Sequence, residues 1–341
     1  METERNISVI IPNYNDAENL GKCLEAVFSS NYKHFEVIVV DDCSNDNSLE
    51  VAGKYPCKLI PLKKHSGAGA ARNTGAKESS GSILFFTDAD CLLNKNTLSI
   101  INRTFPDETK SGTVIGGTYT IMSYDRNFFS IFQSVFINYS ETKKPESPDY
   151  IAAHAMIMDA DTFRKSGGFP EKFLPIIEDV EFSHRLRRMG CRLKMEPEIQ
   201  VRHIFNFALM KSLKNAVRKS CYWTMYSLKN KDMFADSGTA SLELKMNAVL
   251  FFLTLCLLIS GLFSGKAVFL YILPMPILMN SFISRGLLRA FYKTKGGFFA
   301  GAAFLYYILL YPVAVIYGAG AGMVRYLFKR EGQNSVFGVR S

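Results

Sequence analysis

The sequence lacks the cysteine patterns that would indicate a disulfide framework or a zinc site. Its seven cysteines are an odd number, and none of them forms a C-x-x-C pair. We therefore expect reduced thiols, as in cytoplasm. The polar start, METERN, has no apolar core of the kind found in a signal peptide. The first part of the chain is therefore expected to stay in the cytoplasm.

Acidic residues are fewer than basic ones, with 31 Asp and Glu against 40 Lys and Arg, and the formal net charge is +9. Such a charge suits a nucleic-acid binder or a protein on an anionic lipid surface. The basic residues gather beside apolar segments, at 211–231 and 285–295. This placement favours membrane lipids as a partner and argues against nucleic acid.

Apolar residues are spread unevenly along the 341 residues, and two or three structural units are expected. Residues 1–240 have a mixed composition, whereas 247–324 are very apolar. The predicted organisation is a folded domain over 1–206, an amphipathic or interfacial helical linker over 207–246, a membrane region over 247–325 and a basic tail over 326–341.

The apolar region predicts a multi-pass membrane protein. Asn247–Gly265 and Ala267–Ile283 are about long enough to span a bilayer, with a basic loop over 285–297 between them and the next segment. Phe298–Val324 is either a third span or a re-entrant segment broken near Pro312. The stretch before these spans, Phe207–Lys229, is either an interfacial helix or a soluble helix that packs on the first domain.

The first third of the chain alternates apolar strands with helices. Strands are predicted at 7–11, 37–40, 58–62 and 83–87, and later ones at 114–120 and 151–158; helices are predicted at 16–30, 67–77 and 178–189. This alternation predicts a doubly wound α/β sheet, in which ligands bind outside the carboxyl ends of the strands.

Two of the predicted strands end in acidic residues. Asp41 and Asp42 follow one, and Asp88 and Asp90 follow another. Carboxylates one residue apart suit a hard divalent cation such as Mg²⁺ or Mn²⁺, which keeps coordination positions open for phosphate oxygens. An isolated Asp-x-Asp is also common as an acidic turn, so the surrounding motifs decide its meaning.

Four motifs occur in order along the chain: SVIIPNYN at 8–15, VIVVDDCS at 37–44, GAARNTG at 69–75 and TDAD at 87–90. Together they resemble glycosyltransferase family 2 over roughly residues 6–205. The resemblance implies the GT-A fold of the nucleotide-diphospho-sugar transferases, a Rossmann-like, mixed and mostly parallel sheet. It identifies 1–206 as the catalytic domain of a glycosyltransferase.

The resemblance also implies site residues. The nucleotide-sugar site would contain Pro12, Tyr14, Asp41, Asp42, Arg72 and Asp88. Asp42 matches the reader of a uracil-like base, which favours a UDP-sugar. Asp88 and Asp90 match the metal-binding pair, for Mn²⁺ or Mg²⁺. His203 is either a third metal ligand or a structural histidine.

Glu178 and Asp179 match the family's catalytic acid pair. A carboxylate near the acceptor hydroxyl removes its proton as the new bond forms, which suits Asp179 as the base and Glu178 as a positioning acid. The expected outcome is inversion at C1. The alternative is an acidic first turn that only complements the helix dipole. His154 is a weaker candidate for the acceptor pocket.

The chain lacks the Gln-x-x-Arg-Trp motif of processive synthases, so transfer of a single sugar is expected. Its apolar region suggests a lipid-linked or cell-envelope glycan acceptor at the cytoplasmic face of the membrane. The alternative is a non-catalytic family member that scaffolds envelope polysaccharide assembly. That alternative would need the acids to be lost, and all of them are present.

Overall fold

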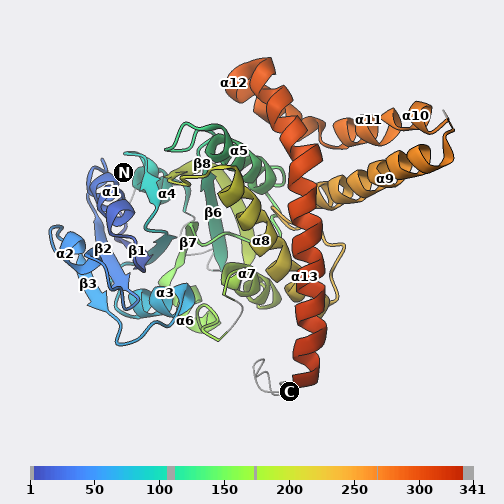
Figure 1. Cartoon of the computed structure of the whole chain (residues 1–341). Coiled ribbons are helices and arrows are strands. Elements are labelled where there is room, and N and C mark those ends of the chain that lie inside the picture. The colour runs from blue at the N-terminus through green and yellow to red at the C-terminus, as the bar shows by residue number, and fades with distance from the viewer. Residues whose placement is uncertain (1–3, 106–111, 173–174, 267, 333–341) are drawn as a thin grey trace. The chain divides into compact units, whose positions relative to one another are not determined.

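The structure is a computed structural model that describes residues 4–105, 112–172, 175–266 and 268–332. The chain divides into two compact units (Figure 1). Unit 1 consists of Met1–Arg126 and Glu141–Asn206, and unit 2 consists of Asn127–Ser140 and Phe207–Ser341. The end of the predicted tail, 333–341, lies outside the described residues.

Unit 1 is built on an eight-stranded sheet in the order β3-β2-β1-β4-β7-β6-β8-β5. The strands are β1 Ile7–Asn13, β2 Phe35–Asp41, β3 Lys58–Pro61, β4 Ile83–Thr87, β5 Cys91–Leu93, β6 Thr113–Tyr119, β7 Ala155–Asp159 and β8 Arg192–His203. The half formed by β3, β2, β1 and β4 is parallel. The other half is mixed, because β7 runs antiparallel to β4 and β6, and β5 runs antiparallel to β8. The predicted α/β sheet is confirmed, and its parallel character belongs to the first half.

The parallel half places the site. Strands β1 and β4 have apolar cores buried on both faces, as parallel strands require. The connection from β1 runs to β2 on one side, and β4 lies on the other, so the strand order reverses between β1 and β4. A crevice outside the carboxyl ends of these strands is the usual binding place in such a sheet.

The described part of unit 1 also contains six helices. They are α1 Ala17–Phe28, α2 Ser48–Ala52, α3 Ala68–Lys77, α4 Thr97–Thr104, α6 Ala160–Ser166 and α7 Glu178–Arg188. Small residues let α3 lie close on the sheet, because a Cβ on Gly75 would come within 2.5 Å of Ile10 Cγ2 and 3.2 Å of Val40 Cγ2.

The predicted strand over 151–158 is partly wrong, because β7 begins only at Ala155. The preceding backbone makes hydrogen bonds with side chains of α7 in place of a neighbouring strand. Ile151 N donates to Ser183 Oγ over 3.0 Å, and Ala153 N donates to Asp179 Oδ2 over 3.1 Å. These bonds attach the segment before β7 to the start of α7.

Unit 2 is helical. Its elements are α5 Phe128–Thr142, α8 Leu209–Asn230, α9 Leu242–Ser264, α10 Val268–Ile272, α11 Pro274–Ile283, α12 Arg285–Leu305, the π-helix η2 Tyr306–Leu310 and α13 Tyr311–Gly332. Most of α5 clusters with the later helices, although it precedes them by more than sixty residues.

Helices α8 and α13 pack at very short range (Figure 1). A Cβ on Gly318 would come within 2.4 Å of Val217 O, and a Cβ on Gly322 would come within 2.3 Å of Cys221 O. Two glycines four residues apart on one helix face are the pattern that lets helix backbones approach each other in membranes. Helix α8 is therefore an integral part of the helical unit.

The apolar region differs from the prediction at two places. The predicted span over 267–283 is formed by two short helices, α10 and α11, which meet at Leu273, and Pro274 begins the second of them. Its first residue, Ala267, lies outside the described residues. The predicted loop over 285–297 is helical and belongs to α12, which is kinked at Lys295 and Gly296. Among the described residues, two helices are long and apolar enough to cross a membrane, Leu242–Ser264 and the joined stretch Arg285–Phe328.

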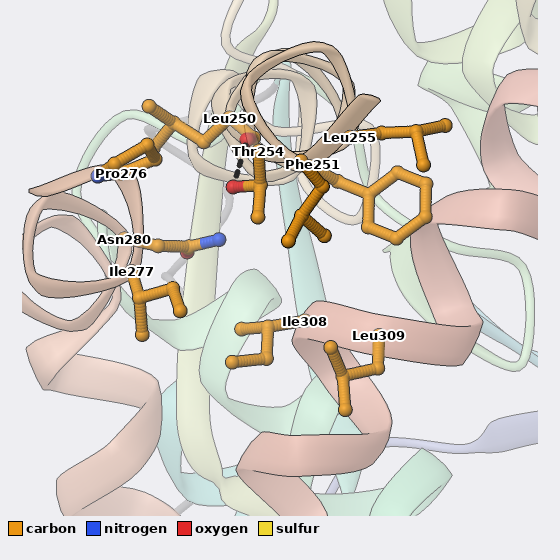
Figure 2. A pocket seen from close by; sticks show the side chains of 10 residues that line it. Leu250, Phe251, Thr254, Leu255, Pro276, Ile277, Asn280, Ile308 and Leu309 are labelled. Atoms are coloured by element: carbon orange, nitrogen blue, oxygen red, sulfur yellow. Dashed lines mark hydrogen bonds between the residues drawn. The ribbon is translucent and has the colours of Figure 1, made fainter. Parts of the chain in front are cut away.

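The π-helix lies immediately before Pro312, whose ring removes one backbone donor. The carbonyl of Tyr307 accepts a hydrogen bond from Asn247 Nδ2 over 2.8 Å, and Asn280 Nδ2 donates to Asn247 Oδ1 over 2.6 Å. Figure 2 shows Asn280 beside an apolar cavity of about 100 Å³ between α9, α11 and η2. A buried chain of amides thus links three helices.

Candidate active site

Arg72 joins two acids that are 90 residues apart in the sequence, Asp88 after β4 and Glu178 at the start of α7. Its guanidinium donates from NH2 to Asp88 Oδ1 over 2.7 Å and from NH1 to Glu178 Oε1 over 2.6 Å. The Arg72 side chain is 4% exposed. Burial alone would raise the pKa of Asp88, but Arg72 holds that pKa below its ordinary value. The predicted catalytic pair therefore lies at the same sheet edge as the predicted metal pair.

Asp90 lies against His203, the last residue of β8. Asp90 Oδ2 is 3.3 Å from His203 Nε2, and the register of β5 and β8 pairs Cys91 with His203. Ligand atoms of these three residues lie within 4.8 Å of one another. Burial raises the pKa of the Cys91 thiol well above its ordinary value, so the thiol stays protonated.

The charge balance around Asp90 fits a cation. Burial and then the carboxylate of Asp88 raise the pKa of Asp90 to about 7. Two neighbouring carboxylates cannot both ionise easily without a positive partner. Oxygen and imidazole donors suit Mn²⁺ and Mg²⁺, with the imidazole favouring Mn²⁺. The carboxylate of Asp90 and the imidazole of His203 are therefore suitable donors for a divalent metal.

Asp179 is half-buried at the start of α7 and accepts a hydrogen bond from the backbone of Ala153. Burial and then the neighbouring Glu178 raise its pKa to about 6. The residue before the pair, Ile177, has a φ of 67°, a left-handed conformation that a β-branched side chain rarely adopts. Such backbone strain is typical of functional sites, where the surrounding structure holds it in place.

The predicted base-reading acid, Asp42, lies beyond the end of β2. Its carboxylate accepts hydrogen bonds from Ser66 N and Gly67 N, each over 2.7 Å, and Oδ2 is 2.9 Å from His65 Nδ1. The ring of His65 lies 4.1 Å from the ring of Tyr14, which is 47% exposed. Asp42 and Tyr14 are thus brought together by the loop before α3, with aromatic surface available for a base.

Asp41 and Pro12 have a different setting. Asp41 is buried at the end of β2, and its oxygens accept hydrogen bonds from Asn13 Nδ2 over 2.9 Å and from the backbone and hydroxyl of Ser44 over 2.9 and 2.6 Å. Its carboxylate holds the turn that presents Asp42. Pro12 lies in β1 opposite Val40. Neither residue has a side-chain contact with the acids near Arg72 among the contacts described.

The loop before α7 is fixed onto α3. Asn73 donates from Nδ2 to Phe169 O over 2.8 Å and accepts from Phe169 N over 2.7 Å. A Cβ on Gly69 would come within 2.8 Å of Pro170 O. The GAARNTG motif therefore places Arg72 between the acids and also attaches the GGFP loop that leads to them.

Two further acids were missed by the sequence analysis. Asp16, before α1, has its pKa raised to about 6 by burial and then by Asp90. Glu141 accepts a hydrogen bond from Thr118 over 2.7 Å and lies 3.6 Å from His154 Nε2. Neither belongs to a motif, so no spacing could have found them.

His154 was a weak candidate and lies well inside the site. Its imidazole is 7% exposed and stacks on Tyr119 with ring centroids 4.0 Å apart. Burial alone would lower its pKa, but Glu141, Asp88 and Asp179 together raise it. These carboxylates therefore favour the protonated form of the imidazole.

Comparisons with known proteins agree with this geometry. Residues 8–166 match the model of the family "Glycosyl transferase family 2". A glycosyltransferase of Haloferax volcanii, AglE, is 47% identical over 92 residues, which are 25% of this chain and 30% of that protein. A poly(ribitol-phosphate) β-N-acetylglucosaminyltransferase of Staphylococcus aureus, TarP, is 37% identical over 33% of this chain and 36% of its own.

The chain thus spans about a third of the length of these two relatives. A glycosyltransferase of Nostoc sp. is 27% identical over 71% of both chains. Among solved structures, a mannosyltransferase from Pyrobaculum calidifontis in complex with GDP-Man and Mn²⁺ is similar in fold, with a TM-score of 0.58 at 17% identity over 96% of this chain and 88% of that one. These matches support a glycosyltransferase enzyme with a GT-A-like fold.

Proposed function

We propose that this chain is an inverting, metal-dependent glycosyltransferase that moves one sugar from a nucleotide-diphospho-sugar to a lipid-linked or cell-envelope glycan acceptor at the cytoplasmic face of a membrane. The observation that carries the proposal is the bridge from Asp88 through Arg72 to Glu178. It joins a site for a diphosphate and its cation to a site for a base.

Asp88, Asp90 and His203 would hold Mn²⁺ or Mg²⁺, and a bound cation stabilises the negative charge of the departing diphosphate. Asp179 accepts the proton of the acceptor hydroxyl, whose oxygen attacks C1 as the bond from C1 to the diphosphate breaks. Attack opposite the leaving group inverts C1. Arg72 holds Asp88 and Glu178 in position through its two hydrogen bonds, which preserves the geometry for both events.

A UDP-sugar is the proposed donor, since Asp42 and Tyr14 suit a uracil base. The solved mannosyltransferase of similar fold holds GDP-Man, so the nucleotide has to be tested directly. The names of the staphylococcal relatives describe transfer to a phosphate-linked envelope polymer. That class of acceptor is consistent with an envelope glycan here.

Helix α9 supports attachment to a membrane. Its most apolar window is 11% buried, and Phe252, Leu262 and Phe263 are 60%, 84% and 89% exposed. A core helix of a soluble protein would bury such side chains, whereas a bilayer accepts them. We propose a multi-pass protein whose unit 1 lies in the cytoplasm.

The test is to incubate the purified full chain and Mn²⁺ with UDP-, GDP- and dTDP-sugars and to measure nucleotide release with and without membrane-lipid extract. We expect release from one nucleotide class that depends on metal and rises with the extract. The competing proposal is a non-catalytic scaffold. It predicts no release from any donor, and that result would reject the enzymatic proposal.

A further inference from the structure

Unit 2 contains a second and larger cavity, of about 350 Å³, which the proposed chemistry does not use. It is lined by α5, α8, the start of α9, α13 and the segment between α8 and α9. Ligand pockets range from about 300 to 1,000 Å³. The cavity beside Asn280 in Figure 2 is about 100 Å³ and too small for a ligand of that kind. The larger cavity has room for part of one hydrocarbon chain.

The lining is apolar with a few polar groups at defined places. Phe136, Leu244, Val315 and Ala319 supply apolar surface. Gln133 of α5 also lines the cavity and is 1% exposed, and its Oε1 has no hydrogen-bond partner among the described residues. A buried amide oxygen without a partner is costly unless a ligand or water supplies a donor.

Two basic side chains complete the lining, Lys219 of α8 and Lys245 of α9. Lys245 Nζ donates one hydrogen bond to Ala235 O, and an ammonium group has three donors in all. An ammonium group beside an apolar cavity matches an anionic head group that is attached to a hydrocarbon chain. Trp223 lies in the same wall, and tryptophan is enriched where apolar chains meet polar head groups. Both features point to a lipid with a negative charge.

We propose that this cavity binds the chain of a single-chain lipid phosphate, with Lys219 and Lys245 contacting its phosphate. The choice of this lipid class rests on the proposed function, because such a lipid would carry the acceptor. One hydrocarbon chain suits the volume. A phosphate supplies the negative charge that an ammonium group attracts, and its remaining hydroxyl is a donor of the kind that Gln133 Oε1 lacks among the described residues. Neutral lipids lack the charge that the lysines match.

The chain offers a direct reporter, because Trp223 is its only tryptophan. The full chain, purified in detergent without any nucleotide sugar, is titrated with a brominated octadecyl phosphate, whose bromine atoms quench tryptophan emission on contact. We expect quenching that saturates near one equivalent. Unlabelled geranylgeranyl phosphate should reverse it, and geranylgeraniol should not. Competition by phosphatidylglycerol instead would assign the cavity to a diacyl lipid and overturn the proposal.

Two sets of variants test the location. Ala319→Phe fills the cavity and should abolish saturable quenching, while Ala321→Phe, on the same helix but outside the lining, should keep it. Lys219→Gln and Lys245→Gln should each weaken binding by roughly fivefold. Lys214→Gln, on α8 but outside the lining, should leave it unchanged. Thermal unfolding in detergent checks that each variant is folded.

The contrary result is quenching that rises without a plateau and is equal in the unsubstituted chain and in Ala319→Phe. That result would mean that Trp223 contacts lipid in the detergent micelle in general, and it would contradict the proposal. The outcome is separable from that of the proposed function. Donor turnover with Mn²⁺ is measured on the same preparations. Loss of lipid binding with intact turnover rejects the cavity alone, and intact binding without turnover rejects the enzyme alone.

Discussion

The two units bury different kinds of polar group. In unit 1 the interior holds charges, with Arg72 between Asp88 and Glu178. In unit 2 the interior link consists of neutral amides, with Asn280 bonded to Asn247 and Asn247 to a backbone carbonyl. Buried charges are costly unless oppositely charged groups lie close to them. Neutral hydrogen bonds between side chains can join helices whose outer surface is apolar. The difference matches the ionic ligand proposed for unit 1 and the membrane setting proposed for unit 2.

The largest expected effect is on Asp179, the charged group of unit 1 assigned to proton transfer. Asp179→Asn should lower the rate of sugar transfer by about 10²- to 10⁴-fold, because the amide cannot accept the proton. Donor affinity, measured by calorimetry, should stay the same. Asp161→Asn, an exposed acid on α6, is the matched control. Normal transfer by Asp179→Asn would place the base elsewhere.

Asp90→Asn should lower metal-dependent turnover by about 10²- to 10³-fold, since it removes a charged ligand that would hold the cation against the leaving diphosphate. The apparent affinity for Mn²⁺, followed by activity against metal concentration, should fall as well. A variant with full activity and unchanged Mn²⁺ dependence would contradict the metal assignment.

Arg72→Leu should reduce the free energy of unfolding by about 3 kcal/mol, because it removes the buried partner of two partly buried carboxylates. Arg103→Gln removes one member of an exposed pair with Glu198 and should cost at most about 1 kcal/mol. Denaturant unfolding of both variants measures the contrast. Equal losses would mean that the buried bridge contributes no more than a surface pair.

In unit 2 the corresponding test concerns the close packing of the backbones of α8 and α13. Gly322→Ala should lower stability by about 1 to 3 kcal/mol, because its methyl group would meet the carbonyl of Cys221. Gly320→Ala has open space around its Cβ and should be neutral or slightly stabilising. Thermal unfolding in detergent compares them, and a stable Gly322→Ala would mean that α8 and α13 lie further apart.

The smallest effect is a pH dependence. The pKa of Asp179 is raised to about 6, and a base must be deprotonated to act. Transfer should therefore be nearly constant above that value and fall about tenfold for each pH unit below it. The profile of kcat against pH, at saturating Mn²⁺, checks this. If kcat fell only near pH 3.9, the ordinary pKa of aspartate, burial would not raise the pKa of Asp179.

Sequence periodicity predicted the parallel half of the sheet well, since each apolar run there is short, continuous and bounded by turn residues. Strand β4 matches its predicted range, and α7 begins at Glu178 as expected. The motif residues Arg72, Asp88 and Glu178 also meet. These features are local, or they are carried by motifs whose order along the chain is informative.

The structural features that the sequence did not predict depend on tertiary contacts. The segment before β7 bonds to α7 side chains, which hydrophobicity alone does not reveal. Hydropathy could not show that 267–283 forms two short helices or that 285–297 is helical. Glu141 enters the site through a hydrogen bond with Thr118, and no motif marks it.

The π-helix also fixes the rotational phase of α13. Each residue of an α-helix advances about 100° around the axis, so removing one residue from 306–310 would turn everything after it by that angle. Gly318 and Gly322 would then face away from α8, and a bulkier side would meet the carbonyls of Val217 and Cys221. The one extra residue in this turn therefore determines which face of α13 packs against α8.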